Sequence, residues 1–217
     1  MRDRMRVIVF GASGKIGRAI LAELVRRGHK VTAVSRAKRP PAEASSVVQW
    51  VRGDATDAAS VARLVVGHDA AVSAIGPGAD GPAATIARAA SALPEGLRQA
   101  HLQRLIVVGG AGSLESSPGV SVLDSPDFPA TFRSVAVAHR EALATLRSDL
   151  ELDWTVITPA RDLSPGIRTG RYRTGGDHLL HDEQGRSRIS IEDFAVALVD
   201  ELETPRHLRR RFTVASV

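Results

Sequence analysis

Short apolar runs alternate with Ala-rich stretches along most of the chain. Short runs rich in Val and Ile are typical of buried strands, whereas longer Ala-rich stretches with spaced polar positions are typical of helices. The predicted strands span Val7–Phe10, Lys30–Ser35, Val47–Arg52, Ala70–Ala74, Leu105–Val108 and Trp154–Thr158. The predicted helices span Lys15–Arg27, Ala58–Val66, Pro82–Ala100 and Ser134–Ser148. This alternation predicts parallel strands joined by helices, and right-handed crossovers place those helices on both faces of a doubly wound sheet.

Several predicted ends have a physical reason. Gly28 follows the first helix, where a left-handed residue is favoured, Asp57 can cap the second helix, and Pro82 suits a first helical turn. Residues Ser113–Pro129 are rich in Ser, Pro, Gly and Asp, so we expect a surface loop beside the substrate.

The pattern weakens from Ile167 to Arg188 and then predicts a helix over Ile191–Leu202 and a short strand over Arg211–Val214. No linker divides the chain. The fold class is therefore α/β: a single domain over residues 1–217, with one doubly wound parallel sheet and a small C-terminal segment on the substrate side.

Composition narrows the function. There is no cysteine, which excludes disulfides and thiolate metal sites and favours a reducing compartment. The charged start Met1–Arg6 and the brief apolar run after it are unlike a signal peptide or a membrane span, so we expect a cytoplasmic protein. The net charge of +5 is scattered and aromatics make up only 4% of the residues, which disfavours nucleic-acid binding. We expect no metal, no membrane partner and a monomer or weak homodimer.

A glycine-rich loop follows the first strand, with Gly11, Gly14 and Gly17 at equal spacing before a helix. The first glycine permits a tight turn, the second lets the backbone approach a pyrophosphate, and the third lets helix and strand pack closely. The helix N-terminus then faces the anion. This loop, at the start of a βαβ chain, predicts a dinucleotide site in a Rossmann fold.

The residues after the second strand indicate which dinucleotide is bound. NAD sites place an acid there for the ribose 2′-hydroxyl, whereas NADP sites place a cation for the 2′-phosphate. The sequence here is Val34–Arg39, which contains Arg36, Lys38 and Arg39 and no acid. We therefore predict NADP(H), with a solvated basic loop as the alternative interpretation.

Two further segments follow strands on the same edge. Asp54 and Asp57 come after the third strand, where each can either contact a ligand or cap a helix. The small residues Ala74, Gly76 and Gly78 come after the fourth strand and would let a cofactor pass close to the backbone. The predicted cofactor-binding residues are Gly11, Ser13, Gly14, Lys15, Ile16, Gly17, Arg36, Asp54, Ala55, Ala74, Ile75, Gly76, Gly109 and Gly110.

These motifs resemble those of the atypical short-chain dehydrogenase/reductase group, in its NmrA-like and flavin reductase (biliverdin reductase B)-like branch. The resemblance spans nearly the whole chain and rests on Gly11–Gly17, Val34–Arg36, Gly53–Asp57, Val107–Ser113, Asp124–Pro129 and Arg188–Phe194. It implies a Rossmann domain in which Asp54 contacts the adenine end of the cofactor. It also implies that His139 and Arg161 face the nicotinamide pocket. The alternative for His139 is a histidine that faces solvent from its helix.

The chain departs from its relatives in its catalytic groups. Ordinary short-chain dehydrogenases pair a Tyr with a Lys four residues later, but the single tyrosine, Tyr172, is followed at that spacing by Gly176. Phe132 lies where the Tyr would lie. The flavin reductase-like branch has a Ser where this chain has Gly110, with Ser113 the nearest hydroxyl. The candidate catalytic residues are His139, Arg161 and Ser113.

Hydride transfer to a flavin, a quinone or a similar planar conjugated acceptor needs no dedicated acid on the protein. We therefore predict an NADPH-dependent oxidoreductase without a Tyr/Lys pair, whose partner is a small-molecule acceptor. A non-catalytic NADP(H)-binding redox sensor of the NmrA-like type is the alternative. An epimerase is disfavoured, because that chemistry also relies on the absent pair.

Overall fold

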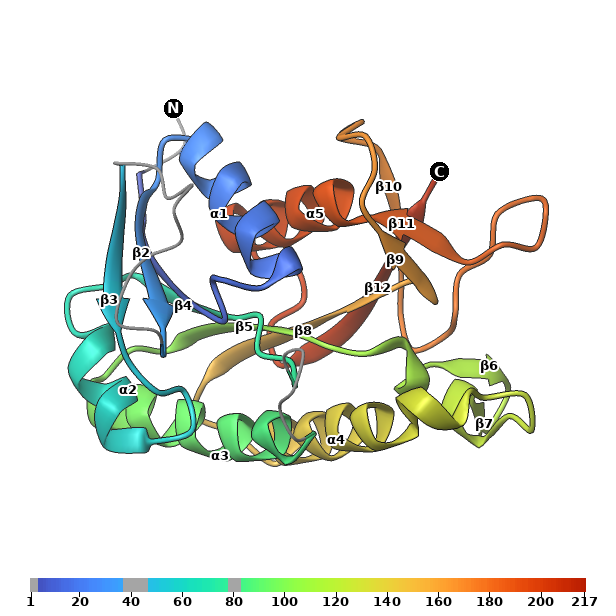
Figure 1. Ribbon diagram of the computed structural model, residues 1–217, viewed down its shortest axis with the longest axis horizontal. Coiled ribbons are helices and arrows are strands. Elements are labelled where there is room, and N and C mark those ends of the chain that lie inside the picture. Colours follow the sequence, from blue (N-terminus) through green and yellow to red (C-terminus); the bar gives the residue numbers. More distant parts are fainter. Residues whose placement is uncertain (1–3, 37–46, 78–82) are drawn as a thin grey trace.

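The computed structural model describes residues 4–36, 47–77 and 83–217. Eight strands form one sheet in the order β10–β12–β8–β5–β4–β1–β2–β3 (Figure 1). Their bounds are β1 Arg6–Phe10, β2 Lys30–Ser35, β3 Val48–Arg52, β4 Ala70–Ser73, β5 Arg104–Val108, β8 Asp153–Pro159, β10 Tyr172–Gly175 and β12 Arg210–Ser216. All neighbours pair in parallel except β10, which is antiparallel to β12. Strand order reverses between β1 and β4, where doubly wound sheets bind ligands.

Helices cover both faces of this sheet, as predicted (Figure 1). One face carries α1 (Lys15–Arg26) and α5 (Ile191–Glu203), and the other carries α2 (Ala58–Val65), α3 (Ala84–Gln99) and α4 (Ala130–Arg147). The α/β class and the Rossmann-like topology are thereby confirmed.

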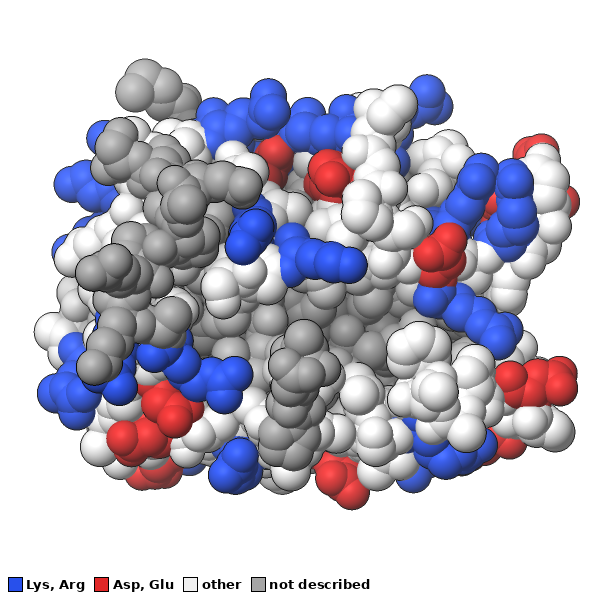
Figure 2. All heavy atoms as spheres, viewed as in Figure 1, with Lys and Arg blue, Asp and Glu red and all other residues white. Residues whose placement is uncertain are grey.

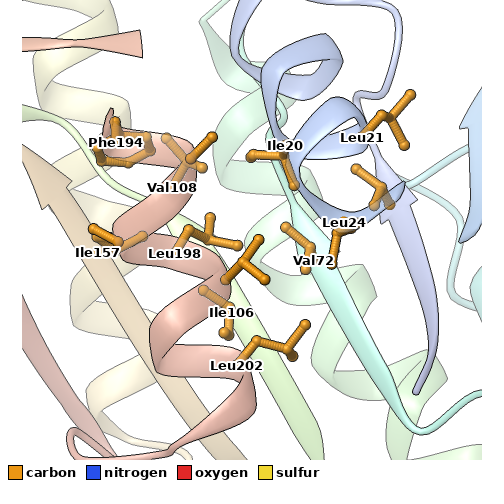
Figure 3. Close-up of a cluster of buried hydrophobic side chains, with 14 of the residues drawn as sticks. Ile20, Leu21, Leu24, Val72, Ile106, Val108, Ile157, Phe194, Leu198 and Leu202 are labelled. Carbon is orange, nitrogen blue, oxygen red and sulfur yellow. The ribbon is translucent and has the colours of Figure 1, made fainter. Parts of the chain in front are cut away.

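The core beneath α1 and α5 is built from aliphatic side chains on alternate strand positions and from one stripe of each helix (Figure 3). Its fully or almost fully buried members include Ile20, Leu24, Val72, Ile106, Ile157, Phe194, Leu198 and Leu202. Burying each such side chain stabilises the fold by roughly 1.5–3 kcal/mol. This packing fixes the glycine loop, which enters α1, against the strand ends.

Most predicted ends lie within one or two residues of the observed ones. Gly28 adopts φ +83°, and the Asp57 side chain caps α2 by accepting a hydrogen bond from Ala59 N. Pro82, predicted to start the third helix, lies outside the described residues. Helix α4 begins at Ala130, four residues before the predicted Ser134, directly after Pro129, which has no N–H and occupies the N-cap position.

The prediction of an irregular loop over Ser113–Pro129 was wrong in part. The segment contains the 3₁₀ turn η2 (Val122–Asp124) and a hairpin of β6 (Glu115–Ser117) and β7 (Val120–Ser121), and the turn η1 (Ala111–Ser113) leads into it. Leu114, Val122 and Leu123 are buried, and burial of these side chains explains why the segment is ordered against the sheet.

A second, two-stranded sheet lies beside the first turn of α5. It joins β9 (Asp162–Ser164) in parallel to β11 (Arg188–Ser190), which runs directly into the helix. This small sheet is the C-terminal segment expected from the sequence, and it borders the carboxyl edge of the main sheet.

Candidate functional site

A cleft of about 840 Å³ opens at the carboxyl ends of β1, β2, β3 and β4, at the point where strand order reverses. Lys and Arg side chains gather over α1 next to it (Figure 2). Its walls comprise Phe10, Gly11, Ser13, Gly14, Lys15, Ile16, Arg18, Val34, Ser35, Arg36, Gly53, Asp54, Ala55, Thr56, Ala74, Ile75, Gly76, Thr85, Leu163 and Ile191. Every predicted cofactor-binding residue except Gly17, Gly109 and Gly110 therefore lines this cleft.

The three glycines of the loop differ in what surrounds them. A Cβ on Gly11, which has φ +77°, would lie 2.4 Å from Ala74 O, and one on Gly17 would lie 2.2 Å from Gly11 O. A Cβ on Gly14 would meet only Gly11 O, at 3.4 Å, so this position faces open space in the cleft. Gly14 is also the N-cap of α1 and has no side chain to cap it. The first N–H groups of α1 thus face a cradle that suits a pyrophosphate.

Cationic side chains surround this cradle. Lys15 and Arg36 line the cleft, and neither forms a hydrogen bond or a close ion pair with another described residue. Arg18 lines it too, and its Nε donates to Ser13 O at 3.0 Å. Arg18 was not predicted from the sequence, although its place one helical turn after Gly14 puts both on one face of α1. The cleft is therefore electropositive where phosphates would lie. Lys38 and Arg39 lie outside the described residues.

The two aspartates after β3 have separate roles. Asp57 caps α2, which explains it without a ligand. Asp54 lines the cleft, and its Oδ1 accepts hydrogen bonds from Thr56 N at 2.9 Å and Thr56 Oγ1 at 2.8 Å. These two bonds lower the pKa of Asp54, so it is ionised at neutral pH. Asp54 is thus a fixed, charged hydrogen-bond acceptor in the wall of the cleft.

His139 faces the sheet rather than solvent. It lies on the stripe of α4 that includes the buried Ala136, Leu143 and Leu146. A Cβ on Gly110 would lie 2.9 Å from His139 Cδ2, so ring and backbone are in contact. The ring forms no hydrogen bond with a described residue. Desolvation lowers the pKa of His139 to about 4, and the imidazole is therefore neutral at physiological pH. The alternative of a solvent-facing histidine was wrong.

None of the three predicted catalytic residues, His139, Ser113 and Arg161, lines the cleft. Ser113 Oγ donates to Gly110 O at 3.2 Å and accepts from Arg211 Nη1 at 2.9 Å, so it ties η1 to β12. Arg161 is exposed between β8 and β9, with its backbone N–H donating to Ser187 Oγ at 3.1 Å. Ser113 and His139 thus both contact Gly110. Arg161 lies apart from them, in the connection between β8 and β9.

Apolar side chains form the remaining wall of the cleft. Leu163 comes from β9, Ile191 from the start of α5, Ile16 from the first turn of α1, and Ile75 from the loop after β4. Leu163, Ile191 and Thr85 were not predicted from the sequence as lining residues. Ile191 lies within the Arg188–Phe194 motif, which was the available signal for it.

The fold and the glycine loop together define a Rossmann-type protein that binds a dinucleotide. The chain belongs to the NAD(P)H-binding family, whose model matches residues 11–205.

Three solved structures resemble the chain over almost its whole length. A Burkholderia pseudomallei protein described as a "putative exported protein" is 45% identical, with a TM-score of 0.89, covering 97% of this chain and 99% of its own. A "putative epimerase" of Bacteroides thetaiotaomicron is 35% identical, with a TM-score of 0.91, covering 99% and 98%. A "putative NADH-flavin reductase" of Streptococcus pneumoniae TIGR4 is 33% identical, with a TM-score of 0.85, covering 98% and 100%.

In the described part of the chain, no helix is both long and apolar enough to cross a membrane. Within residues 4–36, 47–77 and 83–217, no cluster of His, Asp and Glu could hold a metal ion.

Proposed function

We propose that the protein is an NADPH-dependent oxidoreductase that reduces a planar conjugated acceptor such as a flavin or a quinone. The observation that carries this proposal is one continuous cleft, cationic beside the glycine loop and apolar at Ile75, Leu163 and Ile191. A cleft of this kind suits an anionic dinucleotide at one end and a flat apolar ring at the other.

The preference for NADPH rests on Arg36. Its guanidinium lines the cleft at the end of β2 and lies close enough to Asp54 to act on the pKa of that carboxyl. A guanidinium can form a forked hydrogen bond with a 2′-phosphate and stack on an adenine. The described residues at the end of β2, Ser35 and Arg36, include no acid that would accept from a ribose hydroxyl.

The proposed reaction does not need a protein acid. Tyr172, the single tyrosine of the chain, donates its hydroxyl hydrogen to Asp200, and burial raises its pKa. The three lysines are Lys15, Lys30 and Lys38, far in sequence from α4. The bound reduced nicotinamide supplies a hydride, and a flavin or quinone can take its proton from water.

The protein therefore binds, orients and shields the reactants. His139 has no part in this proposal, because its ring is buried against the sheet and does not line the cleft. Arg161, exposed and cationic, can attract an acidic group on the acceptor. Ser113 has no part in this proposal, since its hydroxyl already has two partners. We further propose a cytoplasmic location, which the absence of cysteine supports.

The hydrogen bond of Tyr172 supports a second candidate function. A protein whose only Tyr is bound to Asp200 lacks the usual proton donor of its fold, which is expected of a non-catalytic NADP(H) sensor. An epimerase, as one relative is named, would need that proton donor and is not proposed.

Titration with NADPH and NADH, followed by addition of FMN, riboflavin or a quinone, tests the proposal. We expect tighter binding of NADPH and loss of the absorbance of the reduced nicotinamide when the acceptor is added. Tight binding with no oxidation by any acceptor would favour the sensor instead. If neither nucleotide binds, both candidates are wrong.

A further inference from the structure

A buried threonine lines the cleft without a hydrogen-bond partner. Thr85 is the second residue of α3 and is only 6% exposed. It is one of the residues that line the cleft, and its hydroxyl forms no hydrogen bond with another described residue. Burial of an unpaired hydroxyl destabilises a fold, whereas a valine of nearly the same shape carries no such cost. The proposed function leaves this hydroxyl unexplained.

The oxygen of this hydroxyl can be reached from the cleft. In the described part of the chain, the fully enclosed side-chain atoms without a partner are Trp50 Nε1, Arg104 Nε and Thr158 Oγ1. Thr85 Oγ1 also lacks a partner and is not one of these atoms, so it is not fully enclosed. Because Thr85 lines the cleft, a ligand bound there can supply the missing hydrogen bond.

Thr85 lies on the side of the cleft that contains Asp54. Helix α3 packs beside α2 (Figure 1), and Arg88 and Thr56 line one groove between these helices. Thr56 also lines the cleft and donates two hydrogen bonds to Asp54. Arg88 follows Thr85 by three residues on the same face of α3, and its charge helps to lower the pKa of Asp54. The side of α3 that includes Thr85 therefore faces the end of β3.

Under the proposed function, this part of the cleft takes the adenosine. Arg36, which would hold the 2′-phosphate, directly follows Ser35, and Gly53 N donates to Ser35 O at 3.1 Å. Asp54 comes next in the chain, so its carboxylate lies beside the base of that nucleotide. Adenine carries an amino donor next to ring-nitrogen acceptors. An ionised carboxylate can accept from the amino group, while a hydroxyl can donate to a ring nitrogen.

We propose that Thr85 recognises the adenine of the nucleotide: its hydroxyl donates to a ring nitrogen, and Asp54 accepts from the neighbouring amino group. The pair discriminates against a base with a carbonyl oxygen in place of the amino group, because that oxygen and the Asp54 carboxylate are both acceptors. This inference rests on the proposed function for the placement of the adenosine, but it does not require turnover.

The test measures the Kd values of NADPH, NADH and 2′,5′-ADP by titration calorimetry. Thr85→Val keeps the shape of the side chain and removes the hydroxyl. It should weaken all three ligands by a similar factor, roughly 2- to 12-fold, as expected for one neutral hydrogen bond. The matched control is Thr131→Val, because Thr131 is likewise the second residue of its helix, α4, but is exposed and does not line the cleft. This control should leave all three Kd values unchanged.

Thermal stability separates recognition from a structural role. Thr85→Val should raise the melting temperature of the free protein, because it removes an unpaired buried hydroxyl. Thr85→Ser keeps the hydroxyl and should retain most of the affinity for NADPH. A structural hydroxyl predicts the reverse for Thr85→Val, which is a lower melting temperature with unchanged affinity. Thr85→Ala also removes the hydroxyl, and it replaces the Val variant if that variant does not fold.

Two further results would overturn the inference. One is equal affinity of the wild-type protein for NADH and for reduced nicotinamide hypoxanthine dinucleotide, because the base would then not be recognised. The other is weaker binding of NADPH to Thr85→Val with unchanged binding of 2′,5′-ADP, since the hydroxyl would then face the other end of the cleft. Binding of 2′,5′-ADP that depends on the Thr85 hydroxyl, in a protein that oxidises NADPH with no acceptor, would support this recognition while refuting the proposed reaction.

Discussion

Tyr172 Oη lies 2.6 Å from Asp200 Oδ2, and the other oxygen of that carboxylate accepts from Arg27 Nη1, also at 2.6 Å. The tyrosine of this chain is therefore part of the contact between β10, α5 and α1. It joins the sheet edge to the helices and lies away from the lining of the cleft.

Tyr172→Phe should consequently leave turnover unchanged and cost about 1.5–3 kcal/mol of unfolding free energy, the usual net value of one hydrogen bond to a charged group. Urea denaturation and initial rates of NADPH oxidation measure the two quantities. A drop in rate of a hundredfold, with the fold intact, would instead make Tyr172 the proton donor.

Arg36→Ala should weaken NADPH on the order of 10- to 100-fold while barely changing NADH, since a charged hydrogen bond to the 2′-phosphate is lost. Fluorescence titration with both nucleotides provides the comparison. Arg63→Ala is the matched control, because Arg63 is exposed on α2 and does not line the cleft. Equal losses for both nucleotides would refute the 2′-phosphate assignment.

Gly14→Val should abolish binding of both nucleotides. The added side chain has room, because a Cβ there meets only Gly11 O at 3.4 Å, and so it would fill the cradle without disrupting the fold. Circular dichroism should show an unchanged spectrum. Retained affinity in a folded variant would mean that the pyrophosphate lies elsewhere.

His139 predicts a specific pH dependence. Its pKa is lowered from 6.5 to about 4 in the folded state, so between these values the unfolded chain binds a proton that the folded protein does not. The contribution of His139 to stability is therefore present above pH 6.5 and is lost as the pH falls toward 4. His139→Phe should flatten the curve of unfolding free energy against pH in that window. An unchanged slope would show that the ring is solvated.

The contribution of Glu23 to stability is lost at a lower pH than that of His139. Hydrogen bonds from Arg168 and Arg27 lower the pKa of the 3%-exposed Glu23 from 4.5 to about 2. Its stabilisation is full above pH 4.5 and is lost as the pH falls toward 2. Glu23→Gln should cost about 3 kcal/mol near neutral pH, because it leaves two guanidinium groups poorly paired. The same urea titrations at pH 7 and pH 3 should show a much smaller difference at pH 3.

The fold was predictable from the sequence where local pattern and tertiary structure agree. Val7–Phe10 is buried on both faces of the sheet. Close packing around Gly11 and Gly17 then restricts the path of the backbone after this strand. Residues 113–124 were harder, because their order comes from burying Leu114, Val122 and Leu123 against distant elements, which no local pattern records.

The lining of the cleft by the glycine loop, Arg36 and Asp54 was also predictable, since these residues follow consecutive strands. The wall formed by Leu163 and Ile191 was not. Leu163 belongs to a segment without periodicity, and its position depends on the parallel pairing of β9 with β11, more than twenty residues away in sequence. Whether Asp57 or Asp54 caps α2 likewise needed the observed backbone geometry.

The parts of the cleft come from separate stretches of chain. Under the proposed function, the groups that would hold the phosphates and the adenine lie between Phe10 and Thr56, whereas Leu163 and Ile191 belong to the last third. Substitutions in that last third would then exchange one acceptor for another during evolution while the nucleotide end is inherited unchanged.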